Sequence, residues 1–354
     1  MQVSDFNYEL PPRLIAQDPA PRGASRLMVL DRRSGATAHH GVADLPSLLA
    51  PDDLLVVNDT RVFPARLLGR RVPTGAAVEC MLIGKGTATP APAEGVLYEA
   101  LMHPGQKLRP GARVLFERGN AALHGEVLER RFYGRRVIRL WSEGPEGVDR
   151  LIEQLGHVPL PPYITRADTP ADRERYQTIY ARERGSVAAP TAGLHFSDEL
   201  LRSLDARGIE RVSITLHVGY GTFKPVRVET VEEHTVDPEH YSISEAAARS
   251  IGAALGHRRR IVAVGTTTTR ALEDAALKAS GTVRAGDATA DLFIYPGFHF
   301  QVVGALMTNF HLPRSSLLML VSAFAGRDAV LAAYREAVEE GYRFYSYGDA
   351  MLIW

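Results

Sequence analysis

Apolar and polar positions along the chain predict a series of strands. Residues 26–31 predict a first strand, and 53–58 predict a second one that is mostly buried, because its four apolar residues are consecutive. Residues 211–218 instead alternate apolar and polar positions, which is typical of a half-buried strand. Two further strand-like stretches lie at 260–264 and 291–295.

Helix signals follow these strands through the second half of the chain. Ser242 and Glu245 have the spacing of a capping box before an alanine-rich helix at 244–255. An apolar stretch at 315–325 predicts a buried helix, and 327–340 has the pattern of an amphipathic one. Strands and helices therefore alternate to the end of the chain.

The middle of the chain has a different pattern. From about residue 69 to 140 it consists of short β-type runs separated by glycine and proline, with no helical period, which predicts a small barrel or sandwich. We therefore expect an α/β fold in which residues 1–68 and 150–354 build a main domain with a mixed sheet. An inserted all-β barrel domain at 69–149 would interrupt it.

Charge is unevenly distributed along this chain, although the formal net charge of its 354 residues is zero. Lys plus Arg and Asp plus Glu each total 41, which argues against a polyanion binder held by whole-molecule charge. Residues 70–140 nevertheless contain 12 Lys or Arg against 6 Asp or Glu. Any nucleic-acid contact must therefore be local, although scattered surface arginines explain the same excess without a ligand.

Composition excludes other classes of protein. The single Cys80 rules out an intramolecular disulfide framework and a multi-cysteine zinc site, and it fits a reducing compartment. No signal peptide and no apolar run of membrane-spanning length is present, so we expect a cytoplasmic protein without a membrane partner. Seven histidines lie between 195 and 311 without the paired spacing of a zinc-protease helix, so no metal is expected.

The strongest ligand-binding signal is the segment 261–270, a strand followed by Gly265, four threonines and a helix. Free amide groups at a helix N-terminus favour an anion, and threonine hydroxyls add donors. The segment lacks the Gly-Lys-Thr of a Walker loop. Capping of the helix by Thr266 or Thr267 explains the same residues equally well.

Two other glycine segments adjoin predicted elements. Residues 217–223 follow a strand, and 188–196 precede a helix that Ser197 would cap. Glycine lets a ligand approach the backbone, but Lys224 occupies the last position of a dinucleotide fingerprint, so an NAD site is not expected. Each segment is also explained as a simple turn. Histidines beside such loops are candidates for a general acid or base, because imidazole titrates near neutral pH.

Polar residues gather at two more places. Residues 58–61 end a buried strand, where open α/β sheets place their ligand crevice, although an Asx turn or an ion pair within the segment would use the same side chains. Residues 308–316 put a dense polar group, including Asn309, His311 and Arg314, before an apolar helix. Such groups must bond to one another or to a ligand. These patterns predict a two-domain α/β enzyme with a polar, glycine-lined cleft, and they do not identify a reaction.

Taken together, these segments resemble the S-adenosylmethionine:tRNA ribosyltransferase-isomerase family of queuosine biosynthesis. The matching stretches, in family order, are 5–12, 55–61, 185–196, 216–223, 264–267, 295–297 and 306–326. The family fold, an α/β domain interrupted by a β-barrel, agrees with the architecture expected above. The resemblance implies transfer and isomerisation of the ribosyl moiety of S-adenosylmethionine onto 7-aminomethyl-7-deazaguanine at the tRNA wobble position. The implied products are epoxyqueuosine-tRNA, adenine and methionine.

The implied chemistry consumes S-adenosylmethionine as a cosubstrate and requires no prosthetic group or metal, because the sulfonium acidifies its neighbouring carbon. The implied acid–base candidates are Asp59, His195 and His217. The implied cosubstrate-binding candidates are Thr191, Gly193, Gly219, Tyr220, Gly221, Thr222, Gly265, Thr266, Thr267 and Thr268. The implied RNA-binding candidates are Arg61, Lys224, Arg130, Arg131, Arg135 and Arg136. Asn309, His311 and Arg314 remain as further candidates in the cleft.

Two positions depart from the family pattern. Asp237 stands where relatives commonly have a second histidine, so it receives no proton-transfer role, and Thr268-Thr269 replaces a common Ser-Val. An S-adenosylmethionine-dependent tRNA methyltransferase and a non-catalytic tRNA-binding module are the alternatives. The first would release S-adenosylhomocysteine, and the second would need only the basic insert. We expect the protein to act as a monomer on a tRNA that carries the aminomethyl-deazaguanine in its anticodon.

Overall fold

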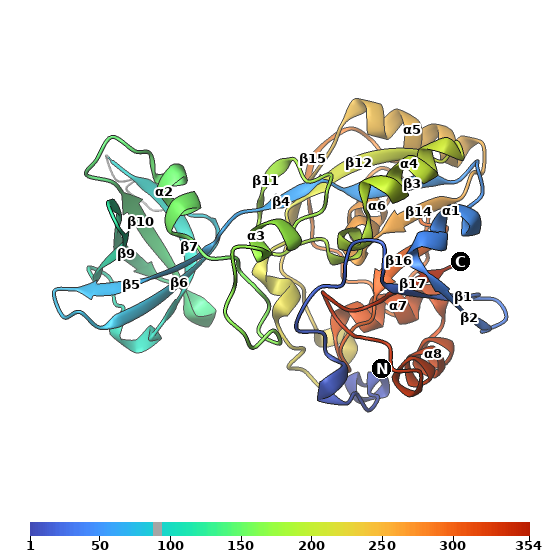
Figure 1. The fold of residues 1–354 in the computed structure, drawn as a ribbon, viewed down its shortest axis with the longest axis horizontal. Coiled ribbons are helices and arrows are strands. Elements are labelled where there is room, and N and C mark those ends of the chain that lie inside the picture. The colour runs from blue at the N-terminus through green and yellow to red at the C-terminus, as the bar shows by residue number, and fades with distance from the viewer. Residues whose placement is uncertain (88–93) are drawn as a thin grey trace.

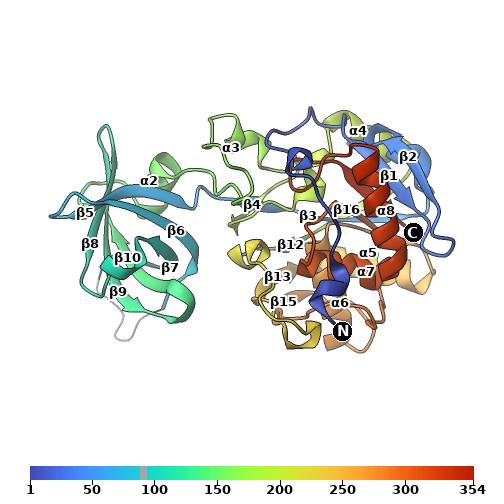
Figure 2. The same cartoon turned by 90° about the horizontal axis from the view of Figure 1, so that it is seen from below.

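The computed structural model describes residues 1–87 and 94–354, which form two bodies connected by extended segments that include β4 (Thr60–Val62) (Figures 1 and 2). The larger body contains both ends of the chain, and the smaller one is a closed β-barrel from the middle of the sequence. The expected fold class, a main α/β domain interrupted by an inserted barrel, is confirmed.

Within the described residues, the main sheet has nine strands in the order β15-β13-β12-β3-β14-β16-β17-β1-β2. Their bounds are β1 Arg26–Leu30, β2 Thr37–Gly41, β3 Leu54–Asn58, β12 Glu210–Leu216, β13 Glu239–Ile243, β14 Ile261–Val264, β15 Gly286–Ala290, β16 Ala305–Asn309 and β17 Ala350–Ile353. The four neighbours β12, β3, β14 and β16 run parallel to one another, and β17 runs antiparallel to β16. The sheet is therefore mixed, and its central strands come from both ends of the chain.

Alternate residues of the central strands pack into two separate cores. In β3, Leu54 and Val56 belong to the first core, whereas Leu55 and Val57 belong to the second. Because neighbouring side chains of a strand point to opposite faces, a strand covered on both sides needs consecutive apolar residues. The apolar run at 53–58 is explained by this double burial.

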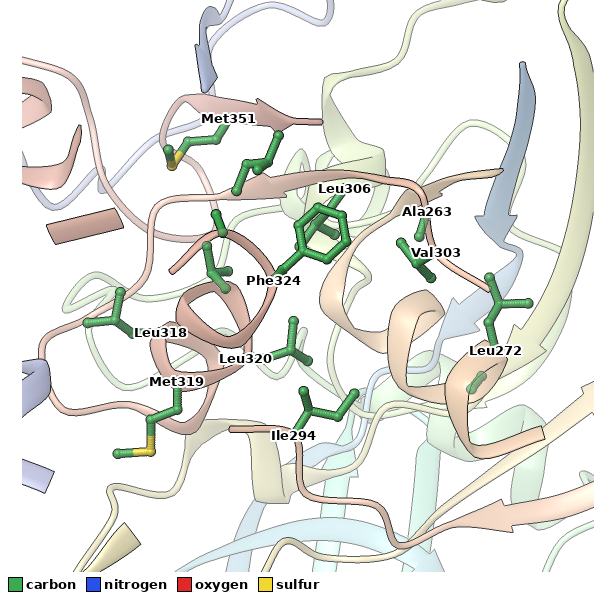
Figure 3. Packing of buried hydrophobic residues seen from close by; sticks show 14 of the residues in the cluster. Ala263, Leu272, Ile294, Val303, Leu306, Leu318, Met319, Leu320, Phe324 and Met351 are labelled. Atoms are coloured by element: carbon green, nitrogen blue, oxygen red, sulfur yellow. The ribbon is translucent and has the colours of Figure 1, made fainter. Parts of the chain in front are cut away.

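Helices cover both faces of the sheet. Their bounds are α1 Leu45–Leu48, α4 Asp198–Ala206, α5 Glu245–Gly256, α6 Thr266–Lys278, α7 Ser316–Ala325 and α8 Arg327–Glu339. Residues of α5 to α8 belong to the first core, and residues of α1 and α4 to the second. Figure 3 shows part of the first core, with Leu306 and Met351 on sheet strands and Leu320 and Phe324 on α7.

The barrel strands close in the order β10-β7-β6-β5-β8-β9, with every neighbouring pair antiparallel. Their bounds are β5 Arg66–Val72, β6 Ala77–Lys85, β7 Val96–His103, β8 Arg113–Arg118, β9 Ala121–Arg130 and β10 Arg135–Trp141. Helix α2 (Val148–Leu155) contributes Leu151 and Ile152 to the barrel core. A two-stranded parallel sheet of β4 (Thr60–Val62) and β11 (Glu183–Ser186) and the short helix α3 (Asp172–Arg175) lie outside the main sheet and the barrel.

Two local predictions are wrong. The capping residue of α5 is Ser244, whose hydroxyl accepts from the Ala247 amide, and Ser242 lies within β13 instead. The strand expected at 291–295 is an irregular segment in this structure, since β15 pairs with β13 only as far as Ala290. Apolar residues of 291–295 pack against the first core without joining the sheet, so their apolar run reflects burial alone.

No single helix among the described residues is long and apolar enough to cross a membrane. In residues 1–87 and 94–354, α7 and α8 are the one pair that meets that length and composition together, and the two helices are bent by 115° relative to each other.

Candidate active site

Polar residues line one edge of the main sheet, where its parallel strands end. Asn58 ends β3, Gly265 directly follows β14, and Asn309 ends β16. These three strands are parallel neighbours, so their carboxyl ends meet at the same edge. This edge is where open α/β sheets bind their ligands.

A small cavity of about 50 Å³ lies at this edge, and we call it the threonine cavity. It includes seven of the candidates expected from the sequence: Thr191, Thr222, Gly265, Thr266, Thr267, Asn309 and His311. Its wall also includes Tyr163, Tyr345 and Ser346, which the sequence did not single out. The segment that begins at Gly265 thus lies beside Asn309, the polar residue that ends β16 more than forty positions further along the chain.

Asn309 carries an unpaired acceptor beside this cavity. Its side chain is 2% exposed, and its Nδ2 group donates to the main-chain carbonyl of Tyr345 at 3.1 Å. Because a carbonyl only accepts, this bond determines which way the amide faces. Across the described residues, no group donates to Asn309 Oδ1. A buried acceptor without a partner is unfavourable by about 1–3 kcal/mol, so Oδ1 is a candidate ligand contact.

His195 contacts the side-chain amide of Asn309. Its Nε2 lies 3.1 Å from Asn309 Nδ2, and its Nδ1 lies 2.9 Å from Ser25 Oγ. Burial lowers the pKa of His195 to about 4, and the nearby Arg343 and Arg22 act in the same direction. The ring is therefore neutral near pH 7, with Nε2 accepting from the amide and Nδ1–H donating to Ser25.

His311 contributes to the cavity wall and to the packing beneath it. Its Nε2 lies 2.9 Å from Thr308 Oγ1, and its backbone N–H donates to the Tyr334 hydroxyl. Burial lowers the pKa of His311 to about 3, so this ring is also neutral. Arg314, in contrast, lies outside the cavity lining and donates from Nε to Asn7 Oδ1.

The N-terminus of α6 faces the cavity through its first two threonines. Gly265 precedes the helix with φ 94° and ψ 151°, a conformation essentially restricted to glycine. Thr266 and Thr267 line the cavity, but Thr268 is fully buried and its hydroxyl donates to the Val264 carbonyl. Since Thr268 only reinforces its own helix, we leave it out of the proposed ligand contacts.

Asp59 and His217 line a different space, a polar cleft of about 670 Å³ that we call the Asp59 cleft. The separation follows from strand alternation, because Thr215 and His217 point to one face whereas Leu216 and Val218 point to the other. Val218 lines the threonine cavity. His217 therefore lies apart from Thr266 and Thr267, although it is close to the 219–223 loop in sequence.

Within the Asp59 cleft, the carboxylate is held in place but not ion-paired in the described structure. Its Oδ1 accepts from Thr215 Oγ1 at 2.7 Å, and burial is the main reason that the pKa of Asp59 is raised. His217 Nδ1 lies 2.8 Å from Thr60 Oγ1, and its ring stacks on His240. Burial, followed by the neighbouring His240, lowers the pKa of His217.

A third space, the interdomain cleft, has a volume of about 670 Å³ and lies between the barrel and the main domain. The barrel side consists of Glu99, Leu101, Arg131, Phe132 and Arg135. The main-domain side includes the candidates Tyr220, Gly221, Thr222 and Lys224. Thr222 and Leu317 line both this cleft and the threonine cavity, so the two spaces adjoin.

An ion pair that the sequence did not suggest supports the 219–223 loop. Glu239 Oε2 accepts from Arg270 Nη1 at 2.7 Å, with side chains only 3% and 11% exposed. Glu239 Oε1 accepts from the Gly219 amide at 2.9 Å. The two partners are 31 positions apart and belong to β13 and α6, so no local pattern could have paired them.

Two of the glycine candidates, Gly193 and Gly221, have no room for a Cβ atom, whereas Gly219 does. A Cβ atom on Gly193 would lie 2.3 Å from the Tyr180 hydroxyl, and Gly193 is not part of the cavity wall. A Cβ atom on Gly221 would lie 2.8 Å from Asp237 Oδ2, whereas one on Gly219 would make only ordinary contacts. Packing against the protein itself therefore accounts for Gly193 and Gly221 without a ligand.

The RNA-binding candidates fall into three groups: one is buried, two are exposed, and three form ion pairs with carboxylates. Arg136 is 2% exposed, and its guanidinium donates to three main-chain carbonyls of the barrel, so we leave it out of the proposed RNA surface. Arg61 and Arg130 are exposed. Arg131 and Arg135 pair with Glu99, and Arg135 and Lys224 both pair with Asp237 at 2.9 and 2.6 Å. Much of the positive charge of the insert is thus already balanced by local carboxylates.

No group of three or more His, Cys, Asp or Glu side chains in residues 1–87 and 94–354 could hold a metal ion.

Comparison with known proteins shows what this chain is similar to. The family described as "Queuosine biosynthesis protein" matches residues 3–353. Proteins named S-adenosylmethionine:tRNA ribosyltransferase-isomerase from Heliobacterium modesticaldum and Symbiobacterium thermophilum are 52% and 53% identical over 354 residues, which is all of both chains in each case. A crystal structure of S-adenosylmethionine tRNA ribosyltransferase from Thermotoga maritima is 38% identical, with a TM-score of 0.54, covering 99% of this chain and 100% of that one. The chain belongs to the queuosine biosynthesis protein family.

Proposed function

We propose that this chain is an S-adenosylmethionine:tRNA ribosyltransferase-isomerase. It transfers and isomerises the ribosyl moiety of S-adenosylmethionine onto 7-aminomethyl-7-deazaguanine in the tRNA anticodon, with release of adenine and methionine. The observation that carries this proposal is the full-length identity of 52–53% to relatives named for this activity. The threonine cavity and the interdomain cleft support it, because the two spaces share Thr222 and Leu317 in their walls and the cleft lies between the two domains.

The threonine cavity fits the amino-acid end of the cosubstrate. The first amide groups of α6 have no intrahelical acceptor and favour the carboxylate, and Asn309 Oδ1 is an acceptor for the neighbouring ammonium. A cavity needs about 10–15 Å³ of this kind of volume to hold one water, so one of about 50 Å³ has room for a small group. We assign it to the charged head group and place the purine outside it. In this proposal His195 is a positioning residue, which holds the Asn309 amide.

Asp59 and His217 are the proposed acid–base groups. The raised pKa of Asp59 brings it closer to neutral pH, which suits a general base, and the Asp59 cleft of about 670 Å³ has room for a nucleoside. This assignment requires the reacting end of a substrate to reach the Asp59 cleft. Arg61, Arg130, Arg131, Arg135 and Lys224 are the proposed phosphate contacts. Localisation in the cytoplasm and action as a monomer stay predictions from the sequence.

Asp237→Asn is expected to strengthen tRNA binding, because Asp237 forms ion pairs with both Arg135 and Lys224 and so competes with phosphate for them. Each additional phosphate that a freed cation neutralises makes the slope of log K against log salt steeper by about 0.7–0.9. Glu233→Gln is the matched control, since Glu233 lines the same cleft and no described residue forms an ion pair with it. Titration of labelled tRNA at several salt concentrations measures both variants. Equal slopes for Asp237→Asn, Glu233→Gln and the parent would contradict the expectation.

One assay tests the proposed function. The protein is incubated with S-adenosylmethionine and tRNA that carries 7-aminomethyl-7-deazaguanine, and small molecules and digested nucleosides are analysed by mass spectrometry. Release of adenine and methionine, with a matching mass gain on the modified nucleoside, is the expected result. S-adenosylhomocysteine with a methylated nucleoside would replace the proposal by a methyltransferase. Binding of tRNA with no conversion of either substrate would leave only a binding module.

A further inference from the structure

Phe132 is unusually exposed for its size. Its relative exposure is 87%, whereas the other large apolar side chains that are exposed in the described structure reach 37–48%. It lies on the short 3-10 turn Phe132–Gly134, which joins β9 to β10 at one end of the barrel. A single exposed apolar residue is ordinary by itself, so what distinguishes Phe132 is where it lies.

The location of Phe132 is the interdomain cleft. The residue is part of the cleft wall, and it faces the same space as Tyr220, Gly221 and Thr222 of the main domain. In the proposed function, the cosubstrate head group lies in the adjoining threonine cavity, so this cleft is the proposed route by which the modified nucleotide approaches it. The ring is therefore placed at the entrance that an anticodon loop would use.

The turn that carries Phe132 is held firmly on both sides. The Arg131 amide donates to the Arg135 carbonyl at 2.8 Å, which closes the turn. The Arg131 guanidinium bonds to Glu99, Glu129 and the Thr87 carbonyl, and Arg135 bonds to Glu99. The backbone beneath the ring is thus fixed before any ligand arrives, which reduces the entropy lost on binding.

The charges that line the cleft nearly balance one another. The wall contains five cationic side chains (Arg131, Arg135, Lys224, Arg227 and Arg270) against four carboxylates (Glu99, Glu233, Asp237 and Glu239). Several of these charges are already paired with one another. Long-range attraction is therefore weak here, and a contact that does not depend on net charge becomes more important.

Unpaired nucleobases meet this requirement. Proteins recognise single-stranded RNA loops by stacking splayed-out bases on aromatic side chains, at about 1–3 kcal/mol per base. We propose that Phe132 stacks on an unpaired anticodon-loop base next to the modified nucleotide and holds the loop at the mouth of the interdomain cleft. This inference rests on the proposed function, because it assumes that the cleft receives an anticodon.

The test uses an anticodon stem-loop RNA with the fluorescent base 2-aminopurine placed at one loop position at a time. Stacking on Phe132 quenches the fluorescence of one position next to the wobble nucleotide when the full-length protein binds. Phe132→Ala should lose this quenching and weaken binding about fivefold to 150-fold. Phe132→Trp should retain both, because it keeps an aromatic face. Because Phe132 is uncharged, the salt dependence of binding should stay unchanged in Phe132→Ala.

Leu277→Ala is the matched control, since Leu277 is an exposed apolar residue of α6 outside all the clefts described above. It should bind and quench like the parent protein. Parent-like quenching and affinity in Phe132→Ala would overturn the inference, as would equal weakening toward a duplex that lacks the loop. The readout is independent of turnover. If quenching depends on Phe132 but no adenine is released, only the proposed reaction is refuted. If the parent releases adenine normally but Phe132→Ala keeps the quenching and affinity of the parent, only the stacking is refuted.

Discussion

Asp59→Asn is expected to lower kcat about 10²- to 10⁴-fold, the usual contribution of a positioned general base. The variant keeps the size of the side chain and an oxygen that can accept from Thr215, so the local packing is preserved. What it removes is a carboxylate whose pKa is raised, mainly by burial. Steady-state rates of adenine release at saturating S-adenosylmethionine and tRNA measure the effect.

The pH dependence of the same variant provides a second readout. A base must be ionised, so kcat of the parent should fall as the pH drops through the raised pKa of Asp59, and Asp59→Asn should lose this dependence. Asp287→Asn is the control, because Asp287 is an exposed carboxylate of the same cleft, with its side chain 71% exposed. A kcat within twofold of the parent would remove Asp59 from the mechanism and leave the threonine cavity and the interdomain cleft as the site of chemistry.

Asn309→Ala is expected to remove the selectivity of the enzyme for the amino group of S-adenosylmethionine. A hydrogen bond from an ammonium to Oδ1 contributes about 1.5–3 kcal/mol, so the parent should bind S-adenosylmethionine about ten- to hundredfold more tightly than its deaminated analogue. Asn309→Ala should bind these two compounds nearly equally. Isothermal titration calorimetry without tRNA measures the four affinities and needs no turnover.

The decarboxylated analogue separates a specific contact from general damage. The carboxylate is proposed to lie at the N-terminus of α6, so the preference for S-adenosylmethionine over this analogue should survive in Asn309→Ala. Loss of both preferences would indicate that the cavity has collapsed, which a shift of the thermal unfolding temperature would report. Retention of the preference for the amino group would show that Asn309 Oδ1 does not bind the ammonium.

Local patterns predicted the elements well where the spacing of apolar residues matches the period of the element. The helices at 315–325 and 327–340 correspond to α7 and α8, and the consecutive apolar residues of 53–58 correspond to β3. Such patterns fail where an apolar run is buried without pairing, as at 291–295, because hydrophobicity reports burial and not hydrogen bonding. The polar segments around Gly265 and Asn309 were found in the sequence, since glycine, threonine and amide residues mark a strand end clearly.

Contacts between distant residues were not predictable in the same way. The pairing of Glu239 with Arg270 and of Asp237 with Arg135 joins residues 31 and 102 positions apart. Arg136 looked like its neighbours in sequence, but strand alternation turns it into the barrel. Sequence neighbours on a strand point to opposite faces, so adjacency along the chain misplaced both Arg136 and His217.

The sequence by itself determined the family, the two-body α/β and barrel architecture, and the strand ends that carry polar residues, because periodicity, glycine and composition are local properties. Only the tertiary structure decided which of those residues share a space. It placed Asn309 beside the start of α6, put Asp59 and His217 in a separate cleft, and exposed Phe132 between the domains. The reason is that strand direction, side-chain alternation and domain placement bring together residues that lie from tens to more than a hundred positions apart, and no local pattern encodes which ones meet.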